Sequence, residues 1–165
     1  AGTYIRNLCR DIGYILGQTT KMGQLRRIAT GPFNEKDSYT LLQLRDAFEE
    51  WKETGNEEKI RKIILPVESL FSHLPKIKIK DSAVDALCHG AELGLPGVVA
   101  ISENITRGCV AGIYTLRDEV IGVAKIRVDS EEIKESIEED KKGKIAKMIA
   151  VLMERNTYPR VWKVR

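Results

Sequence analysis

The residues of this sequence that could do chemistry gather in two segments, and neither holds a complete catalytic set. The first is GTYIRNLCRDIG at residues 2–13 with LRRIATGPF at 25–33, and the second is DSAVDALCHGA at 81–91 with LPGV at 95–98 and MERNTYPR at 153–160. There is no Ser/His/Asp order, phosphate-binding P-loop, dinucleotide glycine fingerprint or HExxH zinc motif. His89 stands alone, which favours a structural histidine. Cys88 lies in an apolar context, which favours an inert buried thiol.

The cysteines and histidines argue against disulfides and against a metal site. Cys9, Cys88 and Cys109 are far apart, odd in number and in no metal-ligand spacing, and the histidines are His73 and His89. This pattern is typical of free thiols in a reducing compartment. We therefore expect no metal.

Together, the two segments resemble the C-terminal half of a dyskerin-type pseudouridine synthase, in the wider TruB-like group. The resemblance covers nearly the whole chain, and its motifs are long and in order. It implies isomerisation of uridine to pseudouridine in rRNA or tRNA at sites chosen by an H/ACA guide RNA, without metal or organic cofactor. It also implies a small zinc-ribbon protein and a small β-barrel protein as partners, a kink-turn binder on the RNA, and a location in the archaeal cytoplasm or the eukaryotic nucleolus.

The first segment resembles the family's GTYIR motif, which implies a place beside the uridine pocket. By this resemblance Arg6 would pair with the catalytic aspartate, Tyr4 would support the pocket, and Leu25 would form a wall around the flipped base. A carboxylate in a closed pocket has its pKa raised by desolvation, and a guanidinium contact opposes that rise.

The catalytic aspartate of the family lies in a motif upstream of GTYIR, and this sequence has no counterpart. Asp11 is a poor surrogate because five residues separate it from Arg6, which is about 140° around a helix. We therefore expect this polypeptide by itself to be inactive. It lacks a starting methionine and enters a helical pattern at once, so we expect a piece of a longer protein.

The second segment resembles a PUA domain, which holds the lower stem and ACA tail of the guide RNA. The residues that this resemblance assigns to RNA binding are His89, Gly90, Ala91, Pro96, Gly97, Lys147, Arg155, Tyr158 and Arg160, with Lys141, Lys142 and Lys144 as further phosphate contacts. Bases at single-stranded ends are bound by stacking and by hydrogen bonds to their edges. Tyr158 has an alternative interpretation as a strand-ending lock packed on the barrel, and Trp162 fits packing better than stacking.

Periodicity predicts helices in the first part of the chain and short strands in the second. Helices are expected at 3–17 with an inward stripe (Ile5, Leu8, Ile12, Ile15, Leu16), at about 40–53 with another (Leu41, Leu44, Ala47, Phe48, Trp51), and just after Asn56. A strand is expected at 21–33. Further on, strands are expected at 76–80, 98–101, 109–116, 120–128 and 146–153, a short helix capped by Asp81, and a loop or frayed helix at 130–140.

The predicted fold class is α+β, with a helix/strand tail of a catalytic domain at 1–72 and a small mixed β-barrel at 73–165. Charge alternates in blocks: residues 1–33 carry five basic and one acidic side chain, and residues 141–165 carry eight basic and one acidic. Such blocks suit a protein that meets a polyanion at chosen places, although they also suit a solvated surface. No stretch approaches the roughly 20 apolar residues of a membrane span.

Two rival functions remain open. One is a non-catalytic PUA-type RNA-binding protein of ribosome assembly or translation, which does not explain residues 1–33. The other is a different PUA-bearing modification enzyme such as a transferase, which requires a cofactor loop that the sequence lacks.

Overall fold

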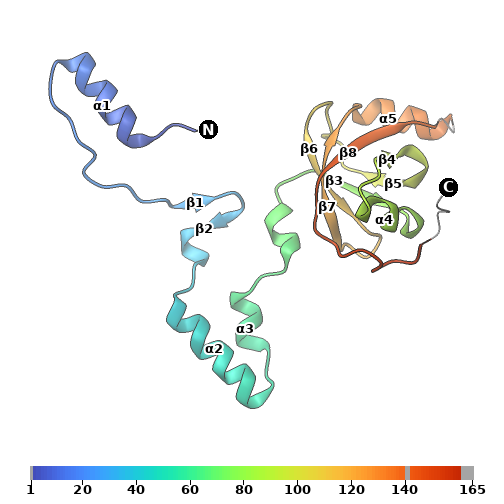
Figure 1. The fold of residues 1–165 in the computed structure, drawn as a ribbon, viewed down its shortest axis with the longest axis horizontal. Coiled ribbons are helices and arrows are strands. Elements are labelled where there is room, and N and C mark those ends of the chain that lie inside the picture. The colour runs from blue at the N-terminus through green and yellow to red at the C-terminus, as the bar shows by residue number, and fades with distance from the viewer. Residues whose placement is uncertain (1, 140–141, 161–165) are drawn as a thin grey trace. The chain divides into compact units, whose positions relative to one another are not determined.

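Helices and short extended segments precede residue 75, and a six-stranded sheet follows it (Figure 1). The structure, a computed structural model, describes residues 2–139 and 142–160. Its contacts divide the chain into two units, one up to Ser38 and one from Tyr39 onward. This division by contacts does not coincide with the domain boundary expected after residue 72. That boundary stays a prediction.

The first unit begins with the predicted helix, α1 (Ile5–Leu16), which ends at Gly17 in the left-handed conformation. The chain then folds back, and the hydroxyl of Thr20 donates to the carbonyl oxygen of Cys9. Gly13 makes this return possible, because a Cβ there would lie 2.7 Å from the carbonyl oxygen of Gln18.

Two expectations for this unit are wrong. The predicted strand at 21–33 is reduced to a hairpin of β1 (Ala29–Thr30) and β2 (Phe33–Asn34), followed by the 3-10 turn η1 (Glu35–Asp37). The inward stripe of α1 is exposed, Ile15 by 83%. The physical reason is size, because a unit of this length cannot surround a helix with its own side chains.

The second unit begins with a helical hairpin whose helices start and end at capping residues. In α2 (Leu41–Thr54), Thr40 and Gln43 form a capping box at the start and Gly55 adopts the left-handed conformation at the end. Asn56 accepts a hydrogen bond from the backbone N–H of Glu58 at 3.0 Å, at the start of α3 (Glu58–Ile63).

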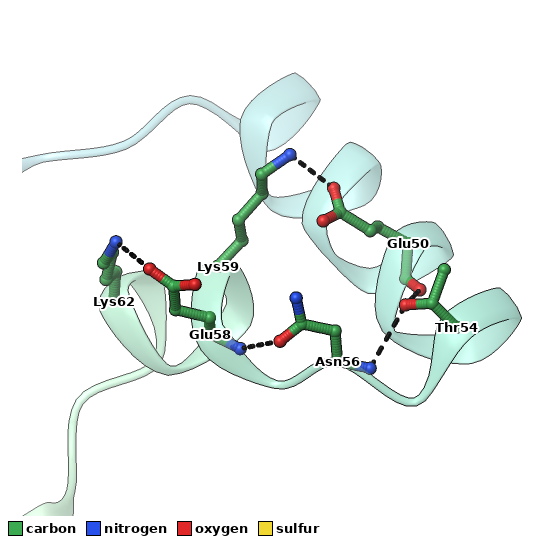
Figure 2. A network of polar contacts seen from close by, with 6 residues as sticks. All are labelled: Glu50, Thr54, Asn56, Glu58, Lys59 and Lys62. Carbon is green, nitrogen blue, oxygen red and sulfur yellow. Dashed lines mark hydrogen bonds and ion pairs between the residues drawn. The ribbon is translucent and has the colours of Figure 1, made fainter.

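Polar contacts tie the two helices of the hairpin together (Figure 2). The ammonium of Lys59 on α3 reaches the carboxylate of Glu50 on α2. Within α3 itself, Lys62 pairs with Glu58 at 2.8 Å. The inward stripe predicted for α2 is only partly correct, since Ala47 is buried but Leu41 is 85% exposed. The 3-10 turn η2 (Val67–Phe71) follows and is tied to the sheet, because the Glu68 carboxylate accepts from the backbone N–H of Val120 at 3.1 Å.

The sheet confirms the predicted mixed β-barrel. Its strands are β3 (Lys76–Ile79), β4 (Leu93–Gly94), β5 (Val98–Ile101), β6 (Val110–Tyr114), β7 (Val120–Ile126) and β8 (Lys144–Val151), in the order β4-β8-β7-β6-β3-β5. β3 and β6 pair in parallel, and the other pairs are antiparallel. The two edge strands, β4 and β5, are joined by the short turn η3 (Leu95–Gly97), so the sheet curls until it is nearly closed.

Alternation along the strands builds the core. Ile77 and Ile79 are fully buried, whereas Lys76 and Lys80 beside them are exposed, as the period-two pattern predicts. The helix α4 (Asp81–Cys88) adds Val84 and Leu87 to the same core. Asp81 is its first residue rather than the expected cap, which is Lys80.

The acidic run after residue 129 forms a helix, α5 (Ser130–Glu138), where a loop or frayed helix was expected. Two anchors explain its order. Ile133 is fully buried in the barrel core, and the Ser130 hydroxyl donates to the carbonyl oxygen of Glu103 at 3.0 Å. Two isoleucines, Ile133 and Ile137, among many acids were too weak a signal to predict this from the sequence.

Candidate nucleic-acid interface

The three residues expected at the uridine pocket are exposed in this chain. Tyr4 immediately precedes α1, Arg6 lies in its first turn, and Leu25 lies in the irregular segment after it. Tyr4 is 77% exposed and Leu25 64% exposed. Within residues 2–139 and 142–160, no hydrogen bond or ion pair engages the Arg6 guanidinium. The Arg6 guanidinium is therefore able to form an ion pair with a carboxylate that does not belong to the described residues.

In the barrel, the residues expected to contact RNA begin at the end of α4. The N–H of Ala91 donates to the carbonyl oxygen of Ala86 at 3.0 Å, and the N–H of Gly90 to that of Leu87 at 2.9 Å. This is a Schellman motif, and Gly90 takes its left-handed position with φ of 88°. It leaves Gly90 and Ala91 exposed, with nothing bulky above the glycine. A flat base could therefore approach this backbone closely.

His89 is held in place by the helix that it ends. Its ring Nδ1 lies 2.8 Å from the carbonyl oxygen of Asp85 and 3.3 Å from the Asp85 carboxylate, whose side chain is buried. The ring is partly exposed next to Gly90. Cys88 is buried, and burial followed by the nearby Asp85 charge raises the pKa of its thiol. The interpretation of Cys88 as an inert thiol agrees with this environment.

Pro96 and Gly97 lie in η3, between the two edge strands. Pro96 is exposed, while a Cβ on Gly97 would lie 3.0 Å from that of Ala83 on α4. The carbonyl oxygen of Gly97 also accepts from the N–H of Lys80 at 2.8 Å. Gly97 therefore allows α4, which carries the Gly90–Ala91 turn at its end, to pack closely on the barrel.

Tyr158 lies in the core rather than on the surface. It is 9% exposed, and its hydroxyl donates to the carboxylate of Glu119, which also accepts from the Thr115 hydroxyl at 3.0 Å. Its ring is thus no exposed stacking plane, and the alternative interpretation as a strand-ending lock fits this geometry. Its neighbours Arg155 and Arg160 are exposed.

We expect Tyr158→Phe to lower the thermal unfolding midpoint by a few degrees, most of all near neutral pH. The hydrogen bond from the Tyr158 hydroxyl lowers the pKa of Glu119 most, and the hydrogen bond from Thr115 lowers it further. The bond between Tyr158 and Glu119 also raises the pKa of Tyr158. Glu119 therefore contributes to the stability of the fold above its unfolded pKa of about 4.3. This contribution is lost as pH falls through its lower folded pKa. Tyr158 contributes to the stability of the fold below about pH 10, and this contribution is lost as pH rises through its higher folded pKa.

Thermal melts of the parent chain and of Tyr158→Phe between pH 3 and pH 11 test this hydrogen bond. The difference between their unfolding midpoints should shrink at both ends of this pH range. A gap that is constant with pH would mean that the hydroxyl contact contributes nothing. Tyr14→Phe, at an exposed tyrosine of α1, is the matched control.

Basic side chains line the outer wall formed by β7 and β8. Lys147 on β8 was among the expected RNA contacts, but Lys125 on β7 and Arg127 immediately after β7 were missed. The signal that could have found them is their two-residue spacing in the strand expected at 120–128, which would put them on one face. Glu92, just after the Gly90–Ala91 turn, accepts from Arg127 at 2.6 Å and from Lys144 at 2.8 Å. The Lys144 contact, aided by Arg127, lowers the pKa of Glu92.

Lys142 is exposed, and the expectations for Lys141 and Trp162 lie outside the described residues. Over the part of the chain that the structure describes, no three His, Cys, Asp or Glu side chains cluster as metal ligands would. The helices of that same part are too short or too polar to cross a bilayer.

Two family profiles match the chain in succession. The profile described as the tRNA pseudouridylate synthase B C-terminal domain matches residues 6–72, and the PUA domain profile matches residues 75–152. Among curated proteins, a "Probable tRNA pseudouridine synthase B" from Methanosarcina mazei is 48% identical over 162 residues, and one from Archaeoglobus fulgidus is 47% identical over 163. The alignments cover 98% and 99% of this chain but 47% and 49% of those relatives, so the chain spans about half their length.

Solved structures give the same result. The chain is 44% identical, with a TM-score of 0.84, to a chain of the "archaeal box H/ACA sRNP Nop10-Cbf5 complex". It is also 44% identical, with a TM-score of 0.82, to a chain of an H/ACA RNP "bound to a substrate RNA containing 2'-deoxyuridine". Each match covers 98% of this chain, and 51% and 50% of those chains, respectively.

Proposed function

The chain belongs to the dyskerin-type, TruB-like pseudouridine synthases, aligning with their C-terminal half, and we propose that it holds the ACA-ended stem of a guide RNA. On this proposal the barrel binds the RNA, while residues 2–33 contribute one side of the pocket that receives the target uridine. The observation that carries the proposal is the succession of a TruB C-terminal domain and a PUA domain in a single chain. A PUA protein without an enzyme parent leaves the match at residues 6–72 unexplained.

The division of labour follows from the chemistry that each part offers. The exposed Gly90–Ala91 turn offers backbone groups and a small surface to an unpaired base, and Lys147, Arg155 and Arg160 offer charge to phosphates. Arg6 offers a guanidinium to a carboxylate. On this proposal the catalytic aspartate comes from the half of the enzyme to which this chain has no counterpart.

Partners follow from the assemblies in which the relatives were solved, which include Nop10 and Gar1. We propose that proteins of these two kinds, one a small zinc ribbon and one a small β-barrel, act beside this chain with a guide RNA and an rRNA or tRNA substrate. Because the reported relatives are archaeal, we propose the archaeal cytoplasm as the site of action.

Binding of the 165-residue chain to an RNA hairpin with an ACA tail tests the proposal. We expect the logarithm of the association constant to fall linearly with the logarithm of salt concentration, by about 0.7–0.9 per phosphate neutralised. The same hairpin with a UUU tail is the matched control and should bind more weakly. Equal affinity for the ACA hairpin and for duplex DNA of the same length would overturn the proposal.

A further inference from the structure

One hydrogen bond joins the two regions that match different family profiles. The turn η2 lies in the stretch matched by the pseudouridine synthase profile, and β7 lies in the stretch matched by the PUA profile. The Glu68 carboxylate on η2 accepts from the backbone N–H of Val120 on β7, 52 residues further along the chain. Glu68 is half-buried and Val120 is 4% exposed. The contact therefore crosses from one matched region to the other inside the second unit.

The barrel depends on this contact for one of its own backbone groups. Val120 starts β7 and pairs with Tyr114, and the register of the two strands shifts between Ile113 and Tyr114. At such an irregularity a ladder N–H can lose its strand partner, and here the Glu68 carboxylate is its acceptor. A buried N–H without an acceptor is costly. Glu68 is therefore required where it is, rather than resting on the barrel by chance.

The turn between β6 and β7 gives η2 a firm point of attachment. Lys78 of β3 pairs with Asp118 in this turn at 2.8 Å. Tyr114, at its start, is buried, and after burial the charges of Glu68 and then Asp118 raise the pKa of its hydroxyl. Other hydrogen bonds of the η2 segment stay local, such as that from the Ser69 N–H to the carbonyl oxygen of Pro66 at 3.0 Å. The Glu68–Val120 contact is thus the one that carries the linker onto the sheet.

We propose that Glu68 is a positioning residue for pseudouridine formation, which fixes the barrel relative to the catalytic part of the enzyme. The inference rests on the proposed function and extends it. A guide RNA held by the barrel has to present its target uridine at a pocket built with residues 2–33, so an error at the joint displaces the uridine. A displacement of about 1 Å can cost about 100-fold in rate. In this role Glu68 touches no RNA and acts through the joint alone.

Glu68→Ala tests the joint in a fusion of the N-terminal half of the Methanosarcina mazei relative with this chain. We expect kcat for guided pseudouridine formation to fall about tenfold. KM for the substrate RNA and guide-RNA affinity should hardly change, because the residues assigned to RNA are untouched. Glu68→Gln should recover most of kcat, since its amide oxygen still accepts from the Val120 N–H. Lys78→Gln is the matched control, because it removes a contact to the same turn from within the barrel.

Amide exchange of Val120 in the 165-residue chain tests the contact directly. The amide should be protected in the parent chain and should exchange about tenfold faster in Glu68→Ala, but not in Lys78→Gln. Rapid exchange in the parent chain would overturn the inference, even if Glu68→Ala failed to fold. An unchanged kcat in Glu68→Ala, the same loss from Lys78→Gln, no recovery in Glu68→Gln, or a loss confined to guide affinity would also overturn it. If the parent fusion gives no guided product, or the parent chain does not bind the ACA hairpin, the proposed function fails instead, so the two failures are distinguishable.

Discussion

Replacing Arg6 by Ala is expected to lower pseudouridine formation on the order of 100-fold, the usual cost of removing one charge-stabilising group from an active site. The assay uses a fusion in which the N-terminal half of the Methanosarcina mazei relative precedes this chain. Guide-RNA affinity should hardly change, because RNA binding is assigned to the barrel. The physical reason is that the guanidinium keeps a desolvated carboxylate ionised and oriented.

The pH dependence distinguishes this role from a merely structural one. Without the guanidinium the pKa of the catalytic carboxylate should rise, so the acid limb of the turnover profile should move to higher pH. Arg6→Lys should recover part of the rate, because it keeps the charge but loses the two-pronged geometry.

The controls for this prediction come from the same chain. Arg45→Ala removes an exposed arginine of α2 that pairs with Asp46 at 3.0 Å, and it should leave turnover unchanged. The 165-residue chain without the fused half should give no product. A loss confined to RNA affinity would refute the pocket role of Arg6.

The substitution Gly122→Ala is expected to destabilise the barrel by about 3 kcal/mol, at the upper end of the usual cost of overpacking. Gly122 lies on β7 opposite Val151 of β8. A Cβ there would overlap the carbonyl oxygen of Ala150 and lie 3.0 Å from the Cα of Val151. These are backbone atoms, so the two strands must separate.

Chemical denaturation and thermal melts of the 165-residue chain measure this effect, with an expected drop in the midpoint of roughly 10 °C or more. RNA affinity should fall as well, since β8 carries Lys147, which is assigned to RNA binding. Gly143→Ala is the matched control, because its Cβ would meet open space, and it should change stability by less than about 0.5 kcal/mol. Equal midpoints for Gly122→Ala and the parent chain would contradict the pairing of β7 with β8.

Local features of the sequence determined many of the elements. The alternation at 76–80 predicts β3, the capping residues Thr40 and Gly55 predict the ends of α2, and Gly17 predicts the end of α1. Each of these signals depends on neighbours within a few residues, so it can be recognised without knowing the fold. The two ordered motif segments likewise indicate the family, because each is a continuous run of residues in the chain.

Only the tertiary structure decided which side chains face solvent and which face each other. The apolar stripe of α1 is exposed, Tyr158 is buried against Glu119, and Lys125 lies opposite Lys147. Burial depends on what else packs nearby, and strand register depends on pairing between distant segments. A shift of one residue would move every side chain to the other face. Local periodicity carries neither kind of information, and so the sequence alone pointed to the Gly90–Ala91 turn as a candidate site but not to Lys125 and Arg127.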